Sequence, residues 1–242
     1  MDKNQFRNAL NQETNNPQTI HGIFNWCDHW CERCKQTKHC SVYKISANLP
    51  SDNPKDFFKS LTTIFETTMD MLKEFSLKND IDFESLEDNL DIKNEYDKEK
   101  QRILHDDGII LSKQYGKMVK RWLNLREKDA LEMELHLQDT MLSECIEIIR
   151  WYQYLFEAKL TRALMTQKEE EKEGLNPYDS LGNAKLLLVS IERNISAWGY
   201  MYQKFKEYED EILDILVCLQ RLNKKIEQTF PEAHTFIRPG LD

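Results

Sequence analysis

Residues 179–202, DSLGNAKLLLVSIERNISAWGYMY, carry the repeat that decides the fold. Apolar side chains recur along this stretch at alternating steps of three and four residues: Leu181, Ala184, Leu188, Ile191, Ile195, Trp198 and Tyr202. Such positions lie on one face of an α-helix. Asp179 and Ser180 precede them, and both residue types cap helix N-termini. We therefore expect one long helix with a single apolar face to bury.

The same spacing extends to both sides of this stretch. It predicts further helices over about residues 54–77, 104–126, 129–170 and 212–226. Gly174 suits the end of the 129–170 helix, and Pro231 cannot continue the last one. Residues 79–100 are rich in Asp, Glu, Asn and Lys, so we expect a solvated connection there that can include short helical turns. Because long helices joined by short loops pack antiparallel, the predicted fold is all-α, an antiparallel bundle of four or five long helices.

The first 52 residues differ from the rest of the chain. They hold four of the six cysteines, three of the six histidines and two of the five tryptophans, with little sustained helical spacing. We interpret residues 1–52 as a four-cysteine metal-binding segment and residues 53–242 as the helical bundle. The tail from Phe230 onwards is expected to lie across that bundle.

Composition excludes several classes of protein. Seven glycines and six prolines in 242 residues leave few turn residues, which disfavours a β-rich fold. The net charge of -9 argues against nucleic acid as a partner, because binding to phosphates needs a surplus of Lys and Arg. No N-terminal apolar leader is visible, and no stretch reaches the ~18 apolar residues of a membrane span. We expect a cytoplasmic protein without membrane contact, whose thiols are reduced or bound to metal.

Four cysteines are crowded into a short segment. Cys27, Cys31, Cys34 and Cys40 have the spacing C-x3-C-x2-C-x5-C and lie within fourteen residues. Thiolates this close repel one another unless a cation neutralises them or they become oxidised. We therefore predict that these four cysteines are metal ligands, as in iron–sulfur and zinc sites.

The spacing favours an iron–sulfur cluster of the [4Fe–4S] type over zinc. Structural zinc sites commonly use two separated C-x2-C pairs, whereas here one such pair lies within a single compact loop and Lys35 follows it. Arg33, Lys38 and Lys44 add further positive charge around the loop, which would lower thiol pKa values. Zinc remains the alternative, and free or redox-active thiols are a third interpretation.

Two resemblances rest on short motifs. Cys31-x2-Cys34-x5-Cys40 followed by Tyr43 resembles the last three ligands of the WhiB-like iron–sulfur proteins. This chain lacks that family's Gly-rich Trp turn and basic tail, so the resemblance does not imply a role in transcription. Residues 30–34, 191–198 and 236–242 together look like a family of uncharacterised bacterial helical proteins, which implies a shared fold and no particular activity. The spacing of Cys27, Cys31 and Cys34 also matches radical-SAM enzymes, but the chain has no strand–helix alternation to build their barrel.

Other polar and sulfur-bearing residues are weaker candidates. His29 and His39 could replace a ligand or donate hydrogen bonds to sulfur, although exposed loop histidines are the simpler interpretation. Cys145 and Cys218 lie on apolar helix faces and are expected in the core. Several charged residues border the apolar stripes, where side chains usually extend to water, although turned inward they could line an anion-binding cleft: Lys159, Arg162, Lys185, Glu192 and Arg193.

The sequence thus leaves three hypotheses for function. The first is a redox- or metal-responsive regulatory protein with a four-cysteine [4Fe–4S] site. The second is a zinc-stapled protein–protein interaction module. The third, an enzyme with an active site in the bundle, rests on the marginal charges alone, and no residue can be assigned a catalytic role. A protein partner or a homo-oligomer fits the first two hypotheses.

Overall fold

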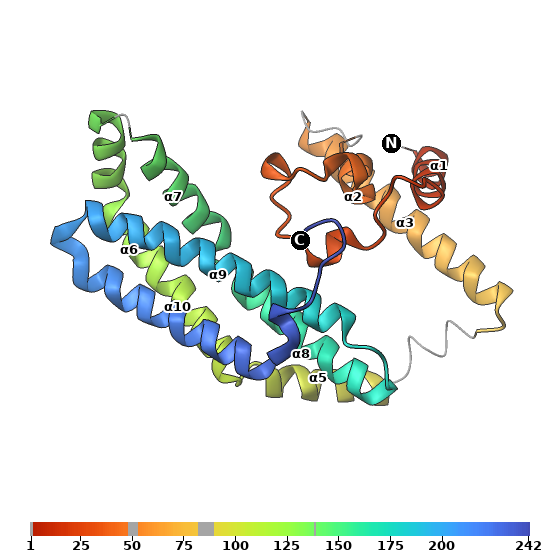
Figure 1. Cartoon of the computed structure of the whole chain (residues 1–242). Coiled ribbons are helices and arrows are strands. Elements are labelled where there is room, and N and C mark those ends of the chain that lie inside the picture. The colour runs from red at the N-terminus through yellow and green to blue at the C-terminus, as the bar shows by residue number, and fades with distance from the viewer. Residues whose placement is uncertain (1, 48–52, 82–89, 138) are drawn as a thin grey trace. The chain divides into compact units, whose positions relative to one another are not determined.

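Helices are the regular elements of this protein. The computed structural model describes residues 2–47, 53–81, 90–137 and 139–242, and no β-strand occurs in these ranges. The chain divides into two compact units (Figure 1). Unit 1 comprises Met1–Phe24, His29–Asp97 and Pro239–Asp242, and unit 2 comprises Asn25–Asp28 and Lys98–Arg238. The predicted all-α class is confirmed, and the boundary expected after residue 52 lies within unit 1.

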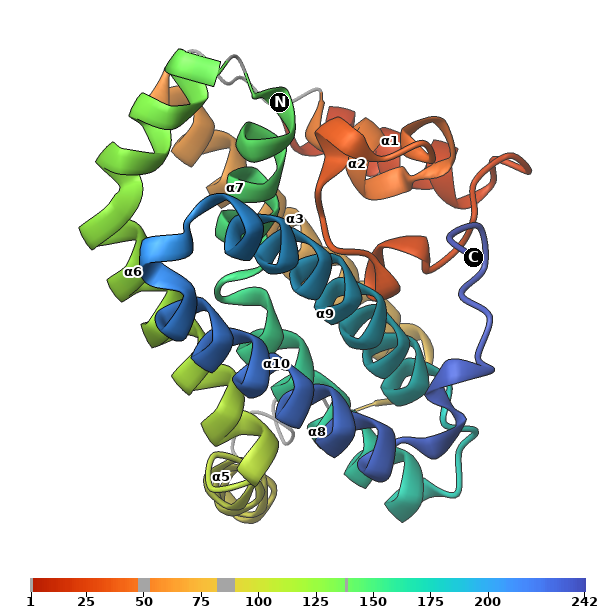
Figure 2. The same cartoon turned by 60° about the vertical axis from the view of Figure 1, so that its left-hand side comes forward.

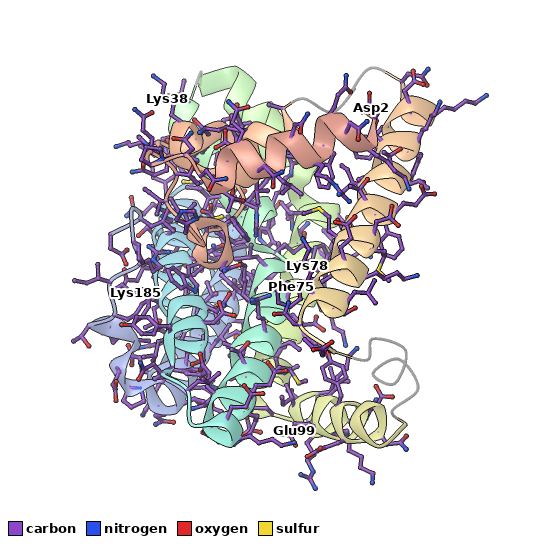
Figure 3. All side chains as sticks on the ribbon, turned by 90° about the vertical axis from the view of Figure 1, so that its right-hand side faces the viewer. Asp2, Lys38, Phe75, Lys78, Glu99 and Lys185 are labelled. Atoms are coloured by element: carbon purple, nitrogen blue, oxygen red, sulfur yellow. The ribbon has the colours of Figure 1, made fainter. Side chains whose placement is uncertain are left out.

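Unit 1 contains the helices α1 (Lys3–Thr14), α2 (Ser41–Ser46) and α3 (Pro54–Lys78). Asp2, labelled in Figure 3, begins α1 with a capping box, in which its carboxylate accepts the Gln5 N–H and the Gln5 side chain accepts the Asp2 N–H. The sequence pattern did not predict α1, because Phe6 is its one fully buried side chain. Helix α3 agrees closely with the predicted 54–77 and begins at the Asn53 cap.

Unit 2 is an antiparallel bundle, which confirms the predicted architecture, although the 54–77 helix counted in that prediction lies in unit 1 as α3. The described part of the bundle has five long helices. They are α6 (Asp107–Leu137), α7 (Thr140–Tyr152), α8 (Leu155–Glu173), α9 (Tyr178–Lys204) and α10 (Glu209–Thr229). Helix α9 contacts α7, α8 and α10, while α6 packs mainly against α10 (Figure 2). The core includes Trp122, whose ring meets those of Trp198 and Phe205 edge-on at 5.3 and 5.6 Å between centroids.

Helix boundaries differ from the expectations in two places. The connection over 79–100 is exposed over most of 94–100, as expected, but it contains most of a full helix, α5 (Leu90–Ile103), instead of short helical turns. Residues 82–89 lie outside the described residues. The single helix expected over 129–170 is instead divided among the end of α6, α7 and α8. Asp139 caps α7, and Gln153 ends it where its side-chain amide donates to the Gly116 carbonyl of α6 at 3.0 Å. A contact between helices therefore overrides the local repeat.

The end of α8 follows the prediction, and the C-terminal tail follows it in part, because Pro239–Asp242 belong to unit 1. Gly174 ends α8 with φ 66°, a left-handed conformation that glycine adopts readily. The tail begins with the short 3-10 turn η5 (Pro231–His234), which packs on α9 and α10. No helix among the described residues has the length and apolar character needed to cross a membrane.

Candidate functional site

The four predicted ligands lie on and beside short 3-10 turns. Cys27 follows η1 (Ile23–Trp26), Cys31 begins η2 (Cys31–Arg33), Cys34 follows η2, and Cys40 follows η3 (Thr37–His39). All four cysteines are half-buried. The N–H of Gln36 donates to Cys34 Sγ at 3.3 Å, a type of hydrogen bond that also tunes metal-bound thiolates. The donor set and its surroundings therefore suit a thiolate-bound metal.

The structure does not bring these thiols together as a metal centre. Within the described ranges, no group of three or more His, Cys, Asp or Glu side chains is arranged to hold a metal ion. Cys27 belongs to unit 2, whereas Cys31, Cys34 and Cys40 belong to unit 1. The four-cysteine site and its cofactor therefore stay predictions.

His39 ties the far end of the loop to the segment before it. Its Nδ1 lies 2.7 Å from the carbonyl oxygen of Gln18, and its own carbonyl accepts the N–H of Ile20 at 2.9 Å. Because a carbonyl oxygen only accepts, Nδ1 must carry the proton of this hydrogen bond. Metal-binding histidines commonly use the same arrangement, which leaves Nε2 for the metal. His29, in contrast, is exposed and has φ 57°.

The near end of the loop is held by the bundle. Residues 25–28 lie against α7, α8, α9 and the tail, all within unit 2. We call the bundle residues that hold this segment the docking site: Trp151, Tyr152, Lys159, Asp179, Gly182, Arg193, Phe236 and Arg238.

Asp28 binds the docking site through its carboxylate. Oδ2 accepts the Tyr152 hydroxyl at 2.5 Å and Arg193 Nη1 at 3.2 Å, and Arg193 also donates to the Tyr152 oxygen at 2.8 Å. Burial raises the pKa of Tyr152 to about 12, and the Asp28 carboxylate adds to this shift. Tyr152 is therefore a permanent hydrogen-bond donor at neutral pH.

Trp26 occupies the other half of the docking site. Its indole N–H donates to Asp179 Oδ1 at 3.0 Å, and its ring meets Phe236 edge-on at 5.8 Å between centroids. The ring lies so close to the α9 backbone at Gly182 that a Cβ there would overlap it. Arg162 holds the second oxygen of Asp179 at 2.6 Å, which orients the acceptor for Trp26.

Lys159 is buried beneath the segment. It is 9% exposed, and its ammonium donates to the Asn25 carbonyl at 3.2 Å. Burial lowers the pKa of Lys159, while the nearby Cys27 and Asp179 oppose that shift. The expectation that this lysine extends to water is wrong, because the segment covers it and supplies an acceptor.

The other charged candidates have different positions. Arg193 belongs to the docking site, and Arg162 contacts it from outside through Asp179. Lys185, labelled in Figure 3, donates to the His234 carbonyl at 2.7 Å, and Glu192 is exposed. Cys145 and Cys218 are buried as predicted, and burial raises the pKa of both thiols to about 11. Both are therefore protonated at neutral pH.

Sequence reasoning missed Trp26, Asp28 and Tyr152 as interacting residues. Asp28 and Tyr152 are 124 positions apart, so no local spacing indicates that they meet. The one available signal was that Trp26 and Asp28 flank Cys27 directly.

Comparisons with known proteins do not place the chain in a family: no family model, curated protein or solved structure matches it.

Proposed function

We propose that this protein is a redox- or metal-responsive regulatory protein whose Cys27, Cys31, Cys34 and Cys40 hold a [4Fe–4S] cluster. The observation that carries the proposal is the position of Cys27 between Trp26 and Asp28, two residues bound by the bundle. The crowding of four half-buried cysteines and the hydrogen bond to Cys34 Sγ support the same site. A cluster would supply a response to oxidants and to iron supply.

The residues around the loop give such a site a connection to the rest of the protein. The Cys27 end is anchored by the docking site, and the Cys40 end is anchored by the contacts of His39 with Gln18 and Ile20. The ordering of the loop and the ordering of these anchors are coupled. When one is already fixed, less conformational entropy is lost on fixing the other. Loss of order in the loop would therefore change the surface of the bundle around residues 25–28.

A second function, a zinc-stapled protein–protein interaction module, is favoured by His39. Its Nδ1 donates to a backbone carbonyl, which leaves the Nε2 lone pair for zinc, a metal that takes mixed nitrogen and sulfur ligands. In that case the metal would be a structural crosslink, and the partner would be another protein or a second copy of the chain.

Metal analysis separates these functions. We expect protein purified without oxygen to be coloured and to contain about four irons and four sulfides per chain. Cys31→Ser and Cys34→Ser should each lose the colour and the iron. Cys145→Ala is the matched control, because it removes a buried thiol outside the loop and should keep the metal. A colourless protein with one zinc per chain would support the interaction module, and a protein without any metal would refute both proposals.

A further inference from the structure

The docking site has the features of a peptide receptor. We propose that it is a peptide-binding site selective for the sequence Trp-X-Asp, filled in cis by residues 25–28 and able to accept the same sequence from another molecule. The proposal does not depend on a metal, because it concerns the bundle residues and not the thiols.

Three groups of the docking site recognise the peptide main chain. Lys159 donates to the carbonyl of Asn25 at 3.2 Å, Arg238 to that of Trp26 at 3.3 Å, and Trp151 to that of Asp28 at 3.0 Å. Hydrogen bonds to carbonyls do not depend on the side chains of the peptide. These three donors therefore fix the direction and position of a bound segment and leave its sequence to be read by other contacts.

Two sets of contacts then read the side chains. One holds a carboxylate between the Tyr152 hydroxyl and the Arg193 guanidinium, an arrangement that an amide cannot match because it lacks the charge. The other holds an indole, which needs the Asp179 acceptor for its N–H and the absence of a side chain at Gly182 for its ring. The two sets of contacts hold residues two positions apart, Trp26 and Asp28, and this spacing defines Trp-X-Asp.

The docking site is organised by the bundle itself. Arg162 orients Asp179, and Glu170 Oε1 accepts the backbone N–H groups of Asp179 and Ser180 at 2.9 and 3.3 Å. Tyr152 is fully buried on α7. Because these residues are held by contacts outside the segment, the site should persist when the segment leaves, and a preorganised site binds with a smaller entropic cost.

Charge favours an acidic occupant. Lys159, Arg193 and Arg238 donate hydrogen bonds to the segment, and the Asp179 carboxylate accepts one from it. Without Asp28 the site has an excess of positive charge, partly buried, which favours a carboxylate ligand. In cis, a short connection gives the segment an effective concentration on the order of millimolar, so a ligand in trans must compete with it.

A peptide-binding experiment tests this proposal. The probe is a fluorescein-labelled peptide of residues 24–30 carrying Cys27→Ser, and binding is followed by fluorescence anisotropy. The full chain with Trp26→Ala and Asp28→Asn, which empties the site, should bind the probe at least tenfold more tightly than the wild-type chain. A probe that also carries Asp28→Asn should bind the emptied chain about tenfold more weakly, as expected for loss of a charge-assisted hydrogen bond.

Matched variants locate the binding. Arg193→Gln in the emptied chain should weaken binding about tenfold, whereas Arg221→Gln, which removes an exposed arginine of α10, should not change it. Circular dichroism first checks that the emptied chain is still helical. If it is not, the binding assay uses the wild-type chain at higher concentration, and unlabelled peptide must displace the labelled probe from it. Equal binding of the Asp and Asn probes, or no binding to a folded chain, would overturn the proposal. If the wild-type chain is a dimer and the peptide dissociates it, the proposal is supported, and the occupant in trans is the 25–28 segment of a second copy.

Discussion

Gly182 is the position where a single methyl group should separate docking from helix stability. It lies on α9 against the Trp26 ring, while Gly199, on the same helix, has open space where a Cβ would be. Alanine in place of a helical glycine stabilises a helix by about 0.5–1 kcal/mol when nothing obstructs it. At Gly182 the added methyl group instead overlaps an indole ring, so the segment must move.

We therefore expect opposite effects from two identical substitutions. Gly199→Ala should raise the melting temperature slightly, and Gly182→Ala should lower it, with a cost of about 1–3 kcal/mol for overpacking and lost contacts. Thermal unfolding followed by circular dichroism measures both changes. Similar rises for the two variants would show that the Trp26 ring is not held against α9.

At the scale of single residues, the sequence indicates which side chains could take part in a site, but it does not indicate which residues they contact. The border positions of Lys159 and Arg193 on apolar stripes mark them as charges that need a partner if they turn inward. Each contacts the 25–28 segment, Lys159 at the Asn25 carbonyl and Arg193 at the Asp28 carboxylate, while the anion-binding cleft stays a prediction. The source of that carboxylate was not predictable, because Asp28 is 165 positions from Arg193. The local sequence pattern does not distinguish a charged side chain that extends to solvent from one that contacts a distant segment.

At the scale of helices, the repeat locates apolar faces but not all the ends. Helix α3 and the Gly174 end of α8 follow from local signals, namely the Asn53-Pro54 start and a glycine free to adopt a positive φ. The break between α7 and α8 depends on Gln153 reaching Gly116 on another helix. Similarly, Asp179 and Ser180 were expected to cap α9, but they lie in its first turn, where Glu170 of α8 accepts their N–H groups.

Asp139 joins α7 to α9 and should make this junction sensitive to acid. Its carboxylate accepts the Leu142 N–H at the start of α7, the Tyr200 hydroxyl and the Lys204 ammonium. The pKa of Asp139 is lowered from 3.8 to about 2, mainly by the hydrogen bond from Lys204 and next by the hydrogen bond from Tyr200. A carboxyl group with a lowered pKa in the folded state stabilises the fold above its ordinary pKa, and this contribution is lost as the pH falls from about 4 towards 2.

The expected result is a difference between wild type and Asp139→Asn that depends on pH. Wild type should be more stable near pH 6, and the two proteins should become similar as the pH approaches 2. Urea unfolding at several pH values measures this difference. A gap that stays constant from pH 6 to pH 2 would mean that the charge of Asp139 does not stabilise the junction.

At the scale of the whole molecule, the four cysteines of the loop are divided between the two compact units. Cys27 belongs to the bundle unit, and the next three cysteines belong to the other unit. The crowding of cysteines is visible in the sequence, but this division is not, because it depends on contacts of residues 25–28 with α7, α8 and α9. Because Cys27 is a proposed ligand within the segment that the bundle holds, metal content should be coupled to the packing of residues 25–28 on the bundle.

That coupling predicts that the docking site affects metal retention although it contributes no thiol. Trp26→Ala removes the indole contacts with Asp179 and Phe236. In this variant, metal binding must also order residues 25–28, which the docking site already orders in the wild-type chain. Ordering one residue costs about 1–2 kcal/mol, which corresponds to roughly tenfold in affinity. The chelator concentration that removes half of the bound metal should therefore fall severalfold in Trp26→Ala and stay unchanged in Arg221→Gln. Identical retention in Trp26→Ala and wild type would show that the metal and the segment are independent, even if the protein binds metal.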